Sequence, residues 1–140
     1  MAILATVGTV SFLGYRNKNR LKLTGDEISS MLRTVHDRAV SQEEGTSWGV
    51  KFVNDNNTNY YYVVFYGNGA PPSGITSTVK YLDGSLKFNL LATNSATTTI
   101  FSQLTGNTTS TAPMTVQVAM RSDTNTSTTI SVYPNGRVEY

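Results

Sequence analysis

The only histidine in the chain, His36, is the one residue that could act as the base of a Ser-His-Asp hydrolase. It falls within a helical pattern, where we expect a lone imidazole to be a polar residue on the helix surface. Two pairs of carboxylates could serve acid and base catalysis, Asp26 with Glu27 and Glu43 with Glu44. Sequence neighbours point in different directions on a helix, so neither pair converges on one substrate. We therefore expect that this protein is not an enzyme.

The sequence also offers little to a metal ion or a cofactor. It contains no cysteine, which excludes thiolate metal sites, disulfides and catalysis by a thiol. Two segments place side-chain oxygens at alternate positions, as a calcium loop does: Asp55, Asn57 and Asn59, and then Asp123, Asn125 and Ser127. Neither segment has the loop glycine or the closing glutamate, so we interpret both as solvated turns. We expect no cofactor and no metal site.

Aromatic residues gather in one predicted strand, at Tyr60, Tyr61, Tyr62, Phe65 and Tyr66. Successive side chains of a strand point to opposite faces, so one set of these rings must belong to the core. The other set either stabilises cross-strand pairs on a threonine-rich sheet or forms a surface for a partner or a glycan.

Four cations follow one another closely near the start of the chain, at Arg16, Lys18, Arg20 and Lys22. This basic segment either meets phospholipid headgroups or acidic groups on neighbouring chains, or is simply solvated. The other cations are dispersed and the net charge is only +2. A broad surface for nucleic acid is therefore not indicated.

Two helical patterns lie at the N-terminal end of the chain. The uncharged run from Ala2 to Leu13 would form a helix of roughly 18 Å, too short to cross the hydrocarbon core of a bilayer alone. Beyond the basic segment, a second apolar stripe repeats with helical period and predicts packing against a sheet: Ile28, Leu32, Val35 and Ala39. Either the helix restarts after Gly25, or one long helix tolerates this glycine.

From Trp48 onward, β-branched and aromatic runs alternate with clusters of Asn, Gly, Pro, Ser and Thr, which is typical of short antiparallel strands. The segment 133–136, YPNG, predicts a tight turn before the last strand. We predict an α+β fold, in which a long N-terminal helix packs on an antiparallel β-sheet or small β-sandwich. Residues 1–45 would form the stem and the amphipathic helix, and residues 46–140 a β-rich head.

The order of these segments resembles the type IV pilin-like proteins. AILATVGTVSFLGYRNKNRL resembles the second half of the pilin N-terminal helix. EISSMLRTVHDRAVSQEEGTSWGVKF resembles the minor pseudopilins of type II secretion, of the GspH/FimT type, and IFSQLTGNT, MTVQVAM and ISVYPNGRVE follow in the family's order. The glycine cleavage site and the Phe-Thr-Leu-Ile-Glu start of the family are absent, so we interpret the chain as N-terminally truncated.

The resemblance implies a structural or minor subunit of a type IV pilus or a type II secretion pseudopilus. Such a subunit sits in the bacterial inner membrane, with its head in the periplasm or outside the cell, before it joins the filament. The residues that would pack in the filament core are those of the stem: Ile3, Leu4, Val7, Val10, Phe12 and Leu13. The implied partners are other pilin or pseudopilin subunits and the inner-membrane assembly machinery.

The resemblance also implies an alternative, a DNA-binding minor pilin of a DNA-uptake pilus. Its contacts would be Arg137, in the Gly-Arg turn, and Arg121. Members with this role carry a second basic residue after that turn, whereas Glu139 stands here. A carboxylate at this position repels phosphate, which weakens the alternative.

Overall fold

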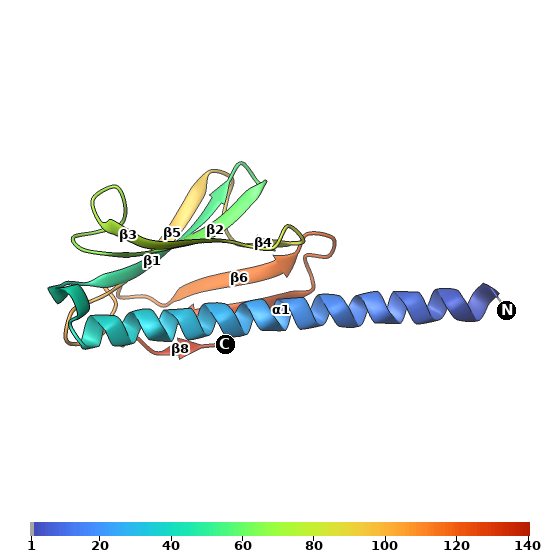
Figure 1. The fold of residues 1–140 in the computed structure, drawn as a ribbon, viewed down its shortest axis with the longest axis horizontal. Helices are drawn as coiled ribbons and strands as arrows, with labels where there is room; N and C mark the ends of the chain where they lie inside the picture. Colours follow the sequence, from blue (N-terminus) through green and yellow to red (C-terminus); the bar gives the residue numbers. More distant parts are fainter. Residues whose placement is uncertain (1) are drawn as a thin grey trace.

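The structure is a computed structural model that describes residues 2–140, with side chains from residue 12 onward. The 39-residue helix α1 (Ala2–Val40) is followed by the short 3-10 helix η1 (Glu43–Gly45). The strands are β1 (Trp48–Asp55), β2 (Asn59–Tyr66), β3 (Ile75–Tyr81), β4 (Leu86–Phe88), β5 (Ser95–Phe101), β6 (Met114–Met120), β7 (Ser127–Val132) and β8 (Val138–Glu139). Figure 1 shows α1 lying along the strands and projecting far beyond them at its N-terminal end.

Helix α1 runs without interruption through Gly25, so the chain adopts the one long helix and does not restart after this glycine. Buried positions recur along one face of the helix, at Leu21, Gly25, Ile28, Leu32, Val35 and Ala39. The helix ends at Val40, shortly before Gln42 takes a left-handed φ of 60°. Arg38 lies in the last turn, where a cation favours the carbonyl end of a helix.

The strands form two four-stranded antiparallel sheets. The first sheet has the strand order β3-β2-β1-β5, and the second has the order β4-β6-β7-β8. Hairpins account for most of the pairs, but β1 also pairs with β5 and β4 with β6, which joins strands that are far apart in the chain. The predicted α+β class, with a helix on antiparallel sheets, is confirmed.

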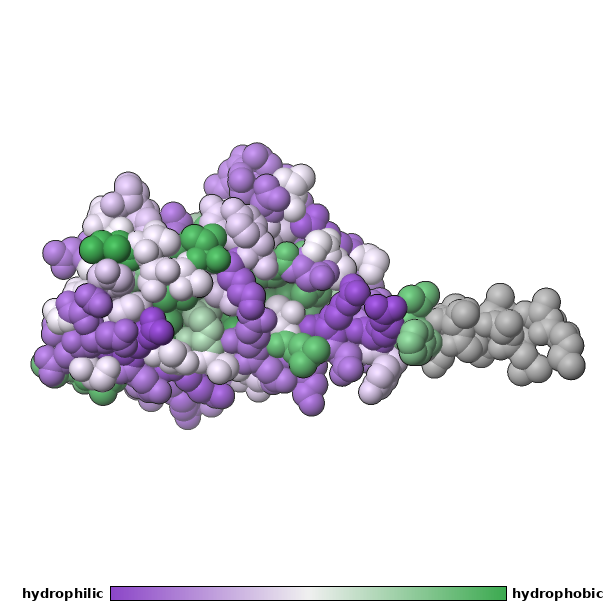
Figure 2. Space-filling model, in the orientation of Figure 1, coloured by the Kyte–Doolittle hydropathy of each residue, from purple (hydrophilic) through white to green (hydrophobic). Residues whose placement is uncertain are grey.

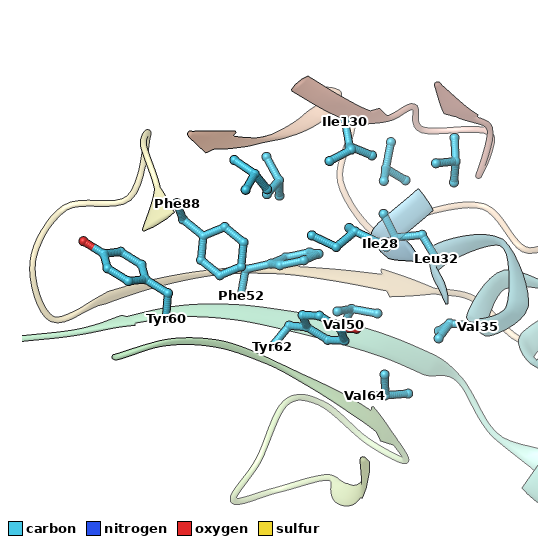
Figure 3. Packing of buried hydrophobic residues seen from close by; sticks show 14 of the residues in the cluster. Ile28, Leu32, Val35, Val50, Phe52, Tyr60, Tyr62, Val64, Phe88 and Ile130 are labelled. Atoms are coloured by element: carbon cyan, nitrogen blue, oxygen red, sulfur yellow. The ribbon is translucent and has the colours of Figure 1, made fainter. Parts of the chain in front are cut away.

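One hydrophobic core joins the helix and both sheets, since α1 contacts β1 and β5 of the first sheet and β6, β7 and β8 of the second. Figure 3 shows Ile28 and Leu32 of α1 between Phe52 of β1 and Ile130 of β7. Phe52 also meets Phe88 of β4 edge to face, with ring centroids 5.5 Å apart. Both sheets therefore pack on the apolar stripe of the helix. Removing the helix or either sheet would expose the core side of the other two layers.

The first sheet has two outer strands, β3 and β5, and one face turned away from the core. All seven residues of β3 are exposed. On the face turned away from the core, Lys51, Val53 and Asp55 of β1 are only half-buried. This outer face is therefore accessible to other molecules.

Candidate interaction surface

The N-terminal part of α1 leaves the head as a free rod. Leu21, with 6% of its surface exposed, is the first buried residue among those whose side chains are described. Residues 2–20 correspond to roughly 28 Å of helix at 1.5 Å per residue. Figure 2 shows apolar side chains at the base of this projection, next to a largely polar head. Phe12 and Leu13, in this part of α1, are 62% and 55% exposed.

Three exposed side chains of α1, those of Phe12, Tyr15 and Leu23, lie on the helix face that turns away from the head. Residues eleven apart are nearly three turns apart, so Phe12 and Leu23 share one face, and Tyr15 is close to it. These three side chains are 62%, 64% and 68% exposed. Leu21 and Ile28 pack on the head from the opposite face. Helix α1 thus exposes three large side chains opposite its docked face, spaced among the polar residues Arg16, Asn19 and Asp26.

The structure describes the side chains of one set of predicted helix residues, but only part of the other set. Ile28, Leu32, Val35 and Ala39 all lie in the core, with 2% or less of their surface exposed. The side chains of Ile3, Leu4, Val7 and Val10 lie outside the described residues. Their role in assembly, together with that of Phe12 and Leu13, stays a prediction.

Polar contacts at three points of α1, namely Glu27, Arg20 and Lys22, fix the head to the helix. Tyr62 of β2 donates a hydrogen bond to the Glu27 carboxylate (3.1 Å), and Lys80 of β3 forms an ion pair with the same oxygen. Burial, together with the charge and the hydrogen bond of Glu27, raises the pKa of Tyr62 well above its ordinary range. Closer to the projecting part, Arg20 lies 3.9 Å from Asp83, in the turn between β3 and β4. Hydrogen bonds from Ser85, and then the charge of Arg20, lower the pKa of Asp83.

The C-terminal residue makes the third contact. The Tyr140 hydroxyl donates a hydrogen bond to the Lys22 carbonyl (3.0 Å), and its ring lies over Gly25. A Cβ atom at Gly25 would come within 2.5 Å of the Tyr140 ring. Burial, and then the neighbouring Asp26, raise the pKa of Tyr140. The absence of a side chain at Gly25 therefore makes room for the end of the chain.

The interpretation of His36 as a helix-surface residue needs correction. Only 27% of its side chain is exposed. Its ring meets Phe101 edge to face at 5.5 Å and packs against Gly106 and Gly136. Its Nδ1 atom lies 3.2 Å from Asp37, which is itself exposed. His36 therefore fills the junction between α1 and the loops after β5 and β7, which is a packing role.

One motif escaped the sequence reasoning. Residues 45–49 read Gly-Thr-Ser-Trp-Gly, which matches the Gly-x-Ser-x-Gly spacing of a nucleophile elbow. That elbow joins a strand to a following helix, whereas Ser47 lies between η1 and the start of β1. No hydrogen bond joins Ser47 to His36 within residues 12–140. The segment therefore matches the residue spacing of the elbow but not its strand-turn-helix geometry.

The two segments with alternating oxygens are turns held by their own side chains. Asp123 accepts hydrogen bonds from the Thr126 hydroxyl (2.6 Å) and the Asn125 amide (3.1 Å), and these bonds lower the pKa of Asp123. The Asn57 side-chain oxygen accepts from Asn54 (2.9 Å). Among the described residues, no three His, Asp or Glu side chains gather closely enough to hold a metal ion.

The two arginines of the nucleic-acid alternative lie apart. Arg121 follows the last residue of β6, where it donates to the Leu86 and Thr58 carbonyls. Arg137 lies near the first residue of β6, forms an ion pair with Glu139 at 2.9 Å and stacks on Tyr133. The seven residues of β6 separate them, so they do not form one cationic patch.

The aromatic strand has rings on both faces, as its sequence implies. Tyr60 and Tyr62 are buried in the core, whereas Tyr61 points to the outer face and pairs with Tyr81 of β3 at 5.1 Å. Phe65 also lies on the outer face, yet it is fully buried because its ring covers Gly49, where a Cβ atom would collide with it.

Comparisons with known proteins agree with this architecture. No protein-family model matches the chain, and no curated protein matches it in sequence. Two crystal structures of the type IV minor pilin FimU of Pseudomonas aeruginosa (strain PAO1) are similar to it. One aligns with a TM-score of 0.59 at 17% identity over 89% of this chain and 90% of that chain. The other aligns with a TM-score of 0.56 at 18% identity over 85% and 90%. The chain has a type IV pilin-like fold.

Proposed function

We propose that this protein is a structural, minor subunit of a type IV pilus or a related secretion pseudopilus, and that it assembles through α1. The observation that carries the proposal is the exposure of Phe12, Tyr15 and Leu23 on the side of that helix that the head leaves uncovered. The fold it shares with a type IV minor pilin supports the same conclusion.

Burial against other chains would stabilise the projecting helix, which is otherwise solvated. Most of the stability of helices in proteins comes from tertiary packing, which this section lacks. Each large apolar side chain that moves from water into an apolar interface contributes about 1.5–3 kcal/mol. Phe12, Leu13 and Leu23 together therefore contribute about 4–9 kcal/mol toward association, part of which offsets the freedom that the associating chains lose. The other subunits and the inner-membrane assembly machinery are the proposed partners.

A membrane stage before assembly is part of the proposal. Although α1 has 39 residues, the described part of the chain holds no helical stretch with the length and hydrophobicity that crossing a bilayer requires. The basic segment stands directly after the apolar run, where its cations would meet headgroups or acidic neighbours. Arg20 is already engaged with Asp83, whereas Lys18 and Lys22 are exposed.

The nucleic-acid alternative draws no support from the geometry. Arg137 is already neutralised by Glu139, and Arg121 is used to hold two loops of the head. Two separated and occupied cations neutralise few phosphates, and phosphate neutralisation supplies most of non-specific affinity.

The test is incorporation into filaments of full-length chains that carry Phe12→Asp together with Leu23→Asp. Both side chains are exposed, so we expect the free energy of unfolding to change by no more than about 0.5 kcal/mol. Incorporation should be lost, because two carboxylates cannot be buried between apolar helices without a large desolvation cost. Filament content is measured by immunoblotting of sheared pili or pseudopili.

The matched control is Val79→Asp, which changes an exposed apolar residue of β3, on the head. This variant should enter filaments like the parent chain. Normal incorporation of the Phe12→Asp and Leu23→Asp variant would refute assembly through this face of α1.

A further inference from the structure

We propose that the outer face of the first sheet carries a binding site for a neutral pyranose sugar, in a hollow beside Tyr61. The hollow has a volume of about 340 Å³. It lies at the end of the sheet where β1 turns into β2 and where β5 begins. The site faces away from α1, so this proposal does not depend on filament assembly.

The floor of the hollow follows from the strand register. Val53 of β1 pairs with Tyr61 of β2 on one side and with Ala96 of β5 on the other. Paired residues point to the same face of a sheet, so two small side chains lie next to a large ring. Tyr81, on the far side of Tyr61, packs against that ring at 5.1 Å and holds it in place. The result is an apolar floor with one aromatic wall, which suits the C–H face of a sugar ring.

Polar groups stand at both ends of this floor. Lys51 and Asp55 lie two residues before and after Val53, on the same face of β1. Asn94 lines the hollow from the turn before β5. Within residues 12–140, neither the Lys51 ammonium, the Asn94 amide nitrogen nor the Tyr61 hydroxyl has a hydrogen-bond or ion-pair partner. Three donors are therefore free to bind hydroxyl groups, which both donate and accept. The Asp55 carboxylate accepts a hydrogen bond from the Asn56 side-chain amide (3.1 Å) and keeps acceptor capacity for a further hydroxyl.

The turns that carry these groups are fastened to each other. The buried Asn54 donates hydrogen bonds to the carbonyls of Leu91 (2.9 Å) and Ala92 (3.0 Å). The Asn56 amide donates to the Asn94 side-chain oxygen (2.9 Å). Both Asn56 and Asn94 have left-handed backbones, with φ of 54° and 55°. A site held in shape in this way loses little conformational entropy on binding, which favours affinity.

The chemistry of the hollow selects among ligands. Lys51 and Asp55 carry opposite charges, so the site has no net charge of its own and favours a neutral ligand. A volume of about 340 Å³ is near the lower end for small-molecule sites, which span roughly 300–1,000 Å³, so one or two sugar rings would fill it. By contrast, the hollow beside Glu27 has its charged groups paired with each other. A pyranose, with one apolar face and a rim of hydroxyls, matches the Tyr61 hollow.

Saturation-transfer difference NMR tests this proposal with three probes, the methyl glycosides of glucose, galactose and N-acetylglucosamine. Each is presented at about 10 mM, because a single ring on an open site is expected to bind with a Kd of roughly 1–10 mM. At least one probe should receive saturation on its ring C–H protons. Tyr61→Ala should reduce that signal at least about fivefold, and Asn94→Ala should reduce it about twofold or more.

Two further variants separate binding from folding. Tyr61→Phe keeps the ring and should keep most of the signal. Tyr15→Ala removes an exposed tyrosine from the projecting helix and should leave sugar binding unchanged. Urea unfolding of every variant confirms that the head is folded.

Three results would overturn the site. The first is no transfer to any of the three glycosides, and the second is an equal signal from the parent chain and Tyr61→Ala. The third is an equal response to the tripeptide Gly-Ser-Gly at the same concentration, which would assign the hollow to peptide.

Discussion

Gly106 and Gly136 let three segments of the chain meet around one imidazole. Both glycines have left-handed φ values, of 69° and 82°. A side chain on either would collide with His36, and one on Gly136 would also meet the Gly106 carbonyl. Glycine is required here both for backbone conformation and for space, because other residues rarely adopt this φ.

A comparison of two glycines separates these requirements. Gly45 has a left-handed φ of 62° but nothing within 4 Å of its missing Cβ, whereas at Gly136 the added atom would lie 2.7 Å from the His36 ring. Gly45→Ala should lower the free energy of unfolding by about 1 kcal/mol, which is the cost of a left-handed alanine. Gly136→Ala should lower it by about 3 kcal/mol, since the collision adds to that cost. Urea denaturation measures both, and equal losses would contradict the packing role of His36.

At the scale of elements, Glu27 binds α1 to two strands of the first sheet. Tyr62 of β2 and Lys80 of β3 reach the same carboxylate oxygen. Tyr62 is buried, with 4% of its surface exposed, so its hydroxyl cannot ionise without placing a second negative charge beside Glu27. The junction between α1 and the sheet is therefore sensitive to alkaline pH.

The sign of that sensitivity follows from the raised pKa of Tyr62. The unfolded chain ionises this tyrosine near its ordinary pKa of 10.0, while the folded chain keeps it protonated. The stabilisation is thus fully present below about pH 10 and is lost as the pH rises above it. When the pH is raised from 9 to 11.5, the free energy of unfolding should fall by about 1–2 kcal/mol less for the Tyr62→Phe variant than for the parent chain.

The measurement is the free energy of unfolding in urea at each pH. Tyr61→Phe is the matched control, because this hydroxyl has no hydrogen-bond partner within residues 12–140. It should follow the parent chain, in which Tyr140 and the lysines still titrate. Parallel curves for the parent chain and Tyr62→Phe would contradict the assignment.

At the scale of the whole molecule, the last residue of the chain holds the helix where it leaves the head. Tyr140 bonds to the Lys22 carbonyl across 118 positions of sequence and lies over Gly25. Just beyond this contact, Arg20 meets Asp83 in the turn between β3 and β4. These two contacts mark the end of the docked part of α1.

A double-mutant cycle tests the Tyr140 contact. Alanine favours a helix over glycine by about 1 kcal/mol, yet Gly25→Ala should bring no gain in the parent chain because Tyr140 must leave. In a Tyr140→Ala background, the same change should stabilise the protein by up to about 1 kcal/mol. Gly14→Ala is the control, since nothing lies within 4 Å of that position, and it should raise helix content by circular dichroism in both backgrounds. An identical effect of Gly25→Ala in both backgrounds would contradict the contact.

Local patterns in the sequence predicted much of this fold, since they depend on neighbours in the chain. The helical period of Ile28, Leu32 and Val35 and the turn at Gly136 are of this kind. The sequence left open whether α1 continues through Gly25. The reason for a glycine at this position, the ring of Tyr140, lies at the other end of the chain. The pairing of β1 with β5 depends equally on distant residues.

For each candidate surface, too, one part could be predicted from the local sequence and another part depends on distant residues. Composition alone predicted an apolar stem. That the helix face with Phe12 and Leu23 stays uncovered can be known only once the head is packed on the other face. The Tyr61 hollow was suggested only as rings on both faces of a strand. Its floor needs the register of three strands, and Asn54 joins turns that are 37 residues apart.

The open border of the first sheet has a practical consequence. All seven residues of β3 are exposed, and within the described residues no strand lies beyond it. A bare row of amide and carbonyl groups is a template for sheet extension by another polypeptide. Lysine commonly guards such borders, but Lys80 is drawn inward to Glu27. Concentrated solutions of this protein should therefore self-associate along β3. Val79→Pro, at a position whose N–H points away from β2, should keep the protein monodisperse in size-exclusion chromatography.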